Sequence, residues 1–213
     1  MKKIDLESWN RKEQYYNFLD FENPFFNICA DVNVQTLKSF TNKNKESFFL
    51  TSYYLVLKTV NAIDAFKLRI RNNEVVMHER IRGSCPILKD NDNFGYGYFN
   101  YLDKYVEFKL DATKIIDEVK SGAPFDPKFD EDDLIHSSVI PWVSFKSFEH
   151  ARRLNRGDSV PKIVMGKTYQ DAKNLMMPVS VSGHHSLMDG LHIGTFFEKF
   201  QLFLNNSDEE LKQ

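Results

Sequence analysis

The side chains best able to do chemistry lie in one short segment, His184-His185-Ser186-Leu187-Met188-Asp189-Gly190. A histidine with an ordinary pKa of about 6.5 is largely neutral near physiological pH, so it can accept a proton from a reacting hydroxyl. The spacing H-x-x-x-D arises often by chance, so a purely structural interpretation of this segment also stays open. In it Asp189 caps a helix, His184 is a surface residue and His185 is a hydrogen-bonded core histidine.

A metal site is a second alternative at this segment, because His185, Asp189 and His192 have a spacing that could converge. No further acidic or thiol ligand clusters nearby, and zinc sites normally use three or four such ligands. Cys29 and Cys85 stand alone, without the close spacing of a metal or redox motif. The sequence therefore favours a site without a metal.

Residues 175–185 predict the strand that must position these histidines, because apolar and other residues alternate along them. Continuing the period of two places His185 on the apolar, inward face. His184 falls on the other face with Ser182, and we expect it to point outward. A helix is expected to begin at Gly190, since apolar residues then recur at helical spacing.

The rest of the chain predicts an α+β fold, with a mixed or antiparallel sheet covered by helices. The expected helices span residues 11–21, 47–63 and 105–121. The other expected strands span residues 25–32, 66–71, 74–79, 81–88, 94–100 and 163–169. Residues 42–45 and 122–133 read as surface loops. No repeat or linker divides the chain, so we expect a single domain over residues 1–213.

Bulk properties exclude several classes of partner. The formal net charge is −2 and charges of both signs are interspersed, so no basic surface for nucleic acid or an anionic membrane is indicated. The N-terminus lacks the apolar stretch of a signal peptide, and no apolar run is long enough to span a bilayer. We expect a soluble, cytoplasmic protein.

Three sequence blocks resemble the chloramphenicol acetyltransferase family, in the family's order and at close to its spacing. They are Trp9-Asn10-Arg11-Lys12-Glu13, then Pro141-Trp142-Val143-Ser144-Phe145, then Met177-Pro178-Val179-Ser180-Val181 leading into His184–Gly190. The acyltransferase core of 2-oxo acid dehydrogenase complexes shares only the H-x-x-x-D-G part. The resemblance covers essentially the whole chain and implies that family's fold.

The resemblance implies a catalytic site. His185 is the general base that takes the proton of the acceptor hydroxyl. Asp189 pairs with Arg11 and holds the histidine segment in position. Ser138, a few residues before Pro141-Trp142, donates to the oxyanion of the tetrahedral intermediate. Without the resemblance, Ser138 reads as a strand serine bonded to nearby backbone.

The resemblance also implies binding residues. Phe18 and Phe25 fall on the acceptor side, while Lys167 and Tyr169 fall on the coenzyme A side. Trp142 and Phe145 could line the coenzyme A tunnel too, but for both we expect core packing. Two departures weaken the acceptor assignment. Phe18 stands where the family has a tyrosine, and Val164 stands where it has a threonine that assists the oxyanion through water.

The implied activity is transfer of acetyl from acetyl-CoA, the co-substrate, to the primary hydroxyl of chloramphenicol. The implied assembly is a homotrimer with active sites between subunits. One alternative keeps the mechanism and changes the acceptor to another small hydroxyl or amine compound. Another is a weakly active trimeric protein that binds hydrophobic ligands. The presence of all four catalytic and supporting residues argues against this last alternative.

Overall fold

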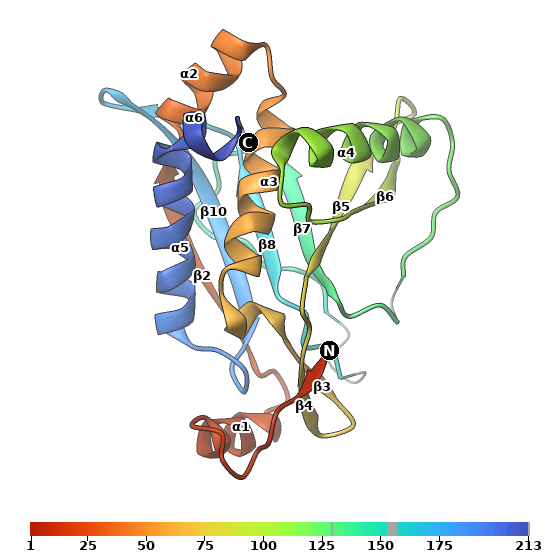
Figure 1. Cartoon of the computed structure of the whole chain (residues 1–213), viewed down its shortest axis with the longest axis vertical. Coiled ribbons are helices and arrows are strands. Elements are labelled where there is room, and N and C mark those ends of the chain that lie inside the picture. Colours follow the sequence, from red (N-terminus) through yellow and green to blue (C-terminus); the bar gives the residue numbers. More distant parts are fainter. Residues whose placement is uncertain (129, 153–156, 213) are drawn as a thin grey trace.

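The computed structural model describes residues 1–128, 130–152 and 157–212, and Figure 1 shows its arrangement. The helices are α1 (Lys12–Leu19), α2 (Gln35–Asn44), α3 (Phe48–Asn61), the short 3₁₀ helix η1 (Asp64–Lys67), α4 (Tyr105–Lys120), α5 (Gly190–Asn205) and α6 (Ser207–Glu210). The strands are β1 (Lys2–Lys3), β2 (Phe25–Asn33), β3 (Leu68–Arg71), β4 (Glu74–Met77), β5 (Arg82–Leu88), β6 (Phe94–Phe99), β7 (Leu134–Ile140), β8 (Lys162–Gly166), β9 (Tyr169–Asp171) and β10 (Asn174–His184).

A large mixed sheet forms the centre of the fold, with strand order β2-β10-β8-β7-β5-β6 and β9 paired to β10. Strand β10 runs antiparallel to β2 and β8, whereas β7 runs parallel to both β5 and β8. The expected α+β class with a mixed sheet and covering helices is confirmed. No helix in the described part of the chain is both long and apolar enough to cross a membrane.

One face of the sheet, the core face, packs against helices α3, α4 and α5 (Figure 1). Strand β10 contributes Met177, Val179 and Val181 to it, and α5 contributes Ile193, Phe196, Phe200 and Leu204, all buried in one cluster. Burying one such side chain stabilises the fold by about 1.5–3 kcal/mol relative to leaving it exposed. This packing fixes β10 and α5, and with them the segment that joins them.

The opposite face of the sheet, the second face, is covered in part by the chain between β7 and β8. Lys162 donates to the carbonyl of Ala151 at 2.9 Å, and Arg152 donates to the hydroxyl of Ser182 at 2.5 Å. Farther along, a side chain at Gly166 would collide with the ring of Phe145. Near the end of β10 both faces of the sheet are therefore buried.

A small sheet, ordered β1-β4-β3, lies beyond the lower end of the large one. It is linked to β7 by Arg69, whose side chain is completely buried. The guanidinium donates to four backbone carbonyls, those of Phe66, Leu68, Asp132 and Leu134. A buried cation is tolerated here because its donors are used.

Two local expectations are wrong. Residues 42–44, expected as a loop, are the last turn of α2, which buries Leu37, Phe40 and Thr41 on one face and ends at left-handed Lys45. The expected strand 163–169 is divided, because the N–H of Lys167 bonds to Val143 outside the sheet. The hairpin between β3 and β4 agrees with its Asn72-Asn73 turn, in which both residues have positive φ.

Candidate active site

His185 follows directly after β10, where its backbone N–H donates to the carbonyl of Pro24 at 2.8 Å. Its imidazole stacks on the ring of Phe18 with centroids 3.8 Å apart and planes inclined by 5°. The ring of Phe26 lies 4.7 Å away on the core-face side. Nδ1 is buried and has no hydrogen-bond partner among the described residues. A reactant can therefore approach this half-buried imidazole only at Nε2.

Arg11 and Asp189 form the ion pair that the resemblance implies. Nη1 of Arg11 donates to Oδ2 of Asp189 at 2.6 Å, and Nη2 donates to the carbonyl of His185 at 3.2 Å. One guanidinium thus connects the histidine's own backbone to the start of α5. Burial alone would raise the pKa of Asp189, but the hydrogen bonds from Arg11 and His192 outweigh it and lower that pKa to about 2. The carboxylate is ionised at neutral pH.

Asp189 also caps α5, because its Oδ1 accepts from the N–H of Leu191 at 3.0 Å. The same oxygen lies 2.9 Å from Nδ1 of His192. The cap and the ion pair therefore coexist, one on each carboxylate oxygen. The described residues contain no group of three or more His, Cys, Asp or Glu side chains that could hold a metal ion.

His184 does not point into solvent, and that expectation is wrong. Its side chain is buried, Nδ1 accepts from the N–H of Ser186 at 3.2 Å, and its ring meets Phe25 edge-on at 5.0 Å. Ser182, on the same face, is buried as well. Strand alternation correctly separated the two histidines but could not show that the chain before β8 covers the second face.

The two expected acceptor-side phenylalanines lie apart. Phe18 contacts the imidazole of His185, whereas Phe25 contacts His184 and supports the guanidinium of Arg152 at 3.4 Å from its ring centroid. The phenylalanine of β2 that does reach His185 is Phe26, which sequence reasoning missed. Alternation along β2, combined with its pairing to β10, was the signal that could have identified Phe26.

Ser138 on β7 is half-buried and lies on the second face. Its partner on the neighbouring strand β8 is Val164, and the partner of Val164 on β10 is Ser180. Ser180 precedes His185 by five residues, about 16 Å along a strand. Two strand spacings of about 4.8 Å add to this separation. Figure 1 agrees: β10 ends beside α1 at the bottom, whereas β7 ends near α4 at the top. Within one chain Ser138 and His185 do not meet.

Lys167 and Tyr169 lie at the same end of the sheet as Ser138. Lys167 is exposed just after β8, and Tyr169 begins β9 with the ammonium group of Lys146 5.3 Å from its ring centroid. Trp142 lies close to this region, since its neighbour Val143 accepts from Lys167 at 3.0 Å. The Trp142 side chain is 65% exposed in the single chain, so the expectation that it packs in the core is wrong.

An aromatic pocket of about 520 Å³ opens at the edge strand β6. Its lining includes Tyr96, Tyr98 and Phe125. Tyr98 pairs with Ser84 on the neighbouring strand β5, and Ser84 pairs with His136 on β7. His136 precedes Ser138 by two residues. The pocket thus adjoins the second face on which Ser138 lies. Sequence reasoning missed it, because strand pairing decides which aromatic side chains gather there.

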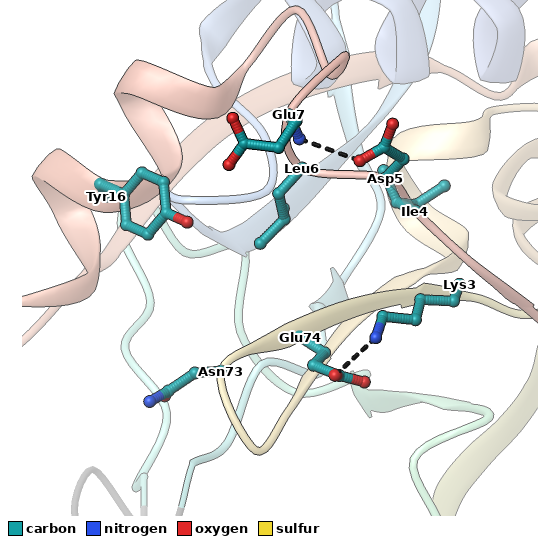
Figure 2. Close-up of a pocket in the computed structure, with 8 residues that line it drawn as sticks. All are labelled: Lys3, Ile4, Asp5, Leu6, Glu7, Tyr16, Asn73 and Glu74. Carbon is teal, nitrogen blue, oxygen red and sulfur yellow. Dashed lines mark hydrogen bonds and ion pairs between the residues drawn. The ribbon is translucent and has the colours of Figure 1, made fainter.

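A second hollow, of about 270 Å³, lies beside the N-terminal segment (Figure 2). Its charged groups are already paired: Lys3 with Glu74 at 2.6 Å, and Asp5 with the N–H of Glu7 at 3.1 Å. Nothing in this hollow contacts His185 or Ser138, and we assign it no role.

The comparisons with known proteins agree with this architecture. A profile of the family described as "Chloramphenicol acetyltransferase" matches residues 1–201. The chain is 26% identical to chloramphenicol acetyltransferase 3 of Escherichia coli over 207 residues, which are 96% of this chain and 97% of that protein. It is 24% identical to chloramphenicol acetyltransferase 2 of Haemophilus influenzae over 206 residues, again 96% and 97%.

Solved structures give the same result. A chloramphenicol acetyltransferase superposes with a TM-score of 0.86 at 30% identity, covering 95% of this chain and 99% of that one. A probable dihydrolipoamide acetyltransferase from Listeria monocytogenes superposes with a TM-score of 0.68 at 13% identity, covering 100% and 97%, and shares the fold. The protein is thus an acyltransferase with the fold of the coenzyme A-dependent enzymes. It belongs to the chloramphenicol acetyltransferase family.

Proposed function

We propose that the protein transfers acetyl from acetyl-CoA to a hydroxyl group of a small acceptor, with His185 as general base. The observation that carries this proposal is the fixed orientation of the His185 imidazole. Phe18 and Phe26 hold the ring, and Arg11 ties the backbone of His185 to Asp189. A base held in one orientation loses little entropy in reaching the reactive geometry.

The proposed acetyl transfer uses Nε2 of His185, the ring nitrogen that remains free to accept a proton. Nε2 of His185 accepts the proton of the acceptor hydroxyl while that oxygen forms a bond to the thioester carbonyl carbon. The carbonyl oxygen becomes an oxyanion, which a hydroxyl donor such as Ser138 stabilises. Collapse of this intermediate breaks the carbon–sulfur bond, and the imidazolium returns its proton to the coenzyme A thiolate. The base is then ready for another cycle.

The separation of His185 and Ser138 supports an assembly in which two chains complete each site. Ser138 is level, across the sheet, with Ser180 on β10, and about 16 Å of chain separates Ser180 from His185. A single chain therefore cannot place Ser138 and His185 at one carbonyl. A cyclic trimer repeats one head-to-tail contact three times and would give three equivalent sites. The exposed Trp142 and Val143 are apolar surface that such a contact can cover.

Chloramphenicol is the first acceptor to test, because the relatives are named for it. The aromatic pocket beside the second face suits a substrate with an aromatic ring.

A different hydroxyl or amine acceptor is the second candidate. It is favoured by Phe18, which cannot donate a hydrogen bond, and by Val164, which offers no hydroxyl beside Ser138. Losing one neutral hydrogen bond costs about 0.5–1.5 kcal/mol, so we expect chloramphenicol to be acetylated weakly.

Release of coenzyme A measures the proposed function directly. The purified protein is given acetyl-CoA with chloramphenicol, or with a panel of alcohols and amines, and free thiol is followed with time. The proposal predicts turnover with at least one hydroxyl compound and turnover about 10²- to 10⁴-fold slower in His185→Ala. Turnover of amines alone would shift the acceptor class. Binding of acetyl-CoA without turnover of any panel member would refute transferase activity.

A further inference from the structure

A group of charged and imidazole side chains lies buried or half-buried on the second face close to Ser138, and the proposed reaction does not use it. We call it the basic cluster, and it consists of His136, His150, Arg152, Asp158 and Lys162. His136 precedes Ser138 by two residues on β7, so both point to the second face about 7 Å apart. Lys162 on β8 is level with His136.

The charges of the basic cluster do not balance. Arg152 and Lys162 carry two positive charges and Asp158 carries one negative charge, which leaves one positive charge within the cluster, and the other carboxylate that acts on Arg152, Glu149, is exposed. Asp158 is shared, at 3.5 Å from Arg152 and 3.7 Å from Lys162, both longer than a direct charged hydrogen bond. The side chains of both cations are only 9% exposed.

The remaining contacts of the two cations are with neutral groups. Arg152 donates to the hydroxyl of Ser182 at 2.5 Å, and Lys162 donates to the carbonyl of Ala151 at 2.9 Å. In addition, Nε2 of His150 is buried without a partner in the described part of the chain. Burial lowers the pKa of both His136 and His150 to about 4, helped by Lys162, so these rings are neutral at pH 7. They can contribute hydrogen bonds but no charge.

An uncompensated buried cation costs several kcal/mol, and a bound anion removes that cost. We propose that the acceptor is a small hydroxyl compound with an anionic group, a carboxylate or phosphate, and that Lys162 and Arg152 bind this group. This inference rests on the proposed function and specifies its substrate class. Because Lys162 is level with His136, two residues before Ser138 on β7, the bound anionic group would lie close to the carbonyl whose oxyanion Ser138 stabilises.

Pairs of acceptors that differ only in the presence of the anionic group, called here the anionic and the neutral twin, test the inference. The pairs are N-acetylserine with its methyl ester, 3-hydroxybutyrate with its methyl ester, and glycerol 3-phosphate with glycerol. Hydrogen bonds to charged groups contribute about 1.5–3 kcal/mol, so at least one anionic twin should have a kcat/KM about tenfold or more above its neutral twin. Equal values within all three pairs would overturn the inference.

Two variants test whether the preference for the anionic acceptor depends on Lys162. Lys162→Met keeps the length of the side chain but removes its charge, so it should lower kcat/KM for the anionic compound about tenfold or more and thereby abolish the preference over the neutral compound. The control Lys173→Met removes an exposed lysine from the turn before β10 and should keep the preference. A preference that survives Lys162→Met contradicts the inference. So does a Lys162→Met protein whose only defect is weaker association of its chains, since a neighbouring chain would then neutralise the cluster.

Calorimetric titration with the same six compounds, without acetyl-CoA, separates this inference from the proposed function. If no acceptor releases coenzyme A, the proposed function fails on its own. Tighter binding of an anionic twin than of its neutral partner, lost in Lys162→Met, would still support the anion site. Absence of any such difference in the wild type overturns it.

Discussion

His185 and His184 are adjacent in the chain, but their side chains have different surroundings. The imidazole of His185 is half-buried between two phenyl rings with Nε2 available. His184 is buried behind β10, where its Nδ1 accepts a backbone N–H. The more exposed imidazole is that of His185, the proposed base, whereas His184 is held by packing and by its backbone hydrogen bond.

The two alanine variants should therefore differ. His185→Ala should lower kcat by about 10²- to 10⁴-fold, the usual contribution of a general base, with little change in melting temperature. His184→Ala removes a buried ring and its hydrogen bond, so its main effect should be a lower melting temperature with most activity kept. Kinetics and thermal unfolding of both variants measure this. Equal losses of activity would show that the roles are assigned wrongly.

The contact between Arg11 and Asp189 gives a second test at the residue scale. Asp189→Asn and Arg11→Ala should each lower both stability and kcat, because the pair joins His185 to the start of α5. The double variant should cost less than the sum, with a coupling of about 0.5–3 kcal/mol. Denaturant unfolding of the four proteins gives this value. Additive costs would mean that Asp189 acts only as a helix cap.

At the scale of elements, β10 is held from both sides, and its second face is the one sensitive to pH. His184 is buried there and His136 and His150 are half-buried, and their loss of solvent lowers the pKa of each to about 4, against an ordinary 6.5. The charge of Arg152 lowers all three pKa values further, while the charge of Asp158 opposes this for His136 and His184. Between pH 6.5 and 4 the unfolded chain binds more protons than the folded chain. Stability is therefore complete above pH 6.5 and falls as the pH drops towards 4.

The acid effect can be measured on one histidine. For His184 the difference of 2.5 pKa units corresponds to at most about 3 kcal/mol of unfolding free energy. His184→Gln cannot be protonated, so its unfolding free energy should fall less steeply between pH 6.5 and 4 than that of the wild type. Denaturant titrations at several pH values give the two slopes. Identical slopes would show that another group controls acid unfolding.

At the scale of the whole molecule, the separation of Ser138 from His185 predicts that each site uses two chains. Ser138→Ala and His185→Ala chains, each nearly inactive alone, should regain activity when refolded together. A trimer that contains both variants has one site in three with an intact histidine and an intact serine, and about three quarters of randomly assembled trimers are of this kind, so about a quarter of wild-type activity is expected. Activity that stays at background would place both residues in one chain or exclude Ser138. Ultracentrifugation of the wild type checks for the trimer independently.

The sequence determined the features that depend on local pattern. Alternation along residues 175–185 placed His184 and His185 on opposite sides of β10, because side chains of a strand alternate whatever the strand pairs with. Helical spacing identified α4 and α5, and the apolar character of residues 47–63 on all sides identified α3 as a buried helix. Asn72-Asn73 identified a turn that only a few residue types adopt. The polar helix α2 was missed because its buried stripe is narrow.

Only the tertiary structure decided which segments meet. The burial of His184, the contact of Phe26 with His185 and the linking role of Arg69 all join segments distant in sequence. The basic cluster likewise unites β7, β8 and the chain between them. Local pattern reports the period of a strand but not its neighbours, since strand order and the covering of a face come from packing of the whole chain.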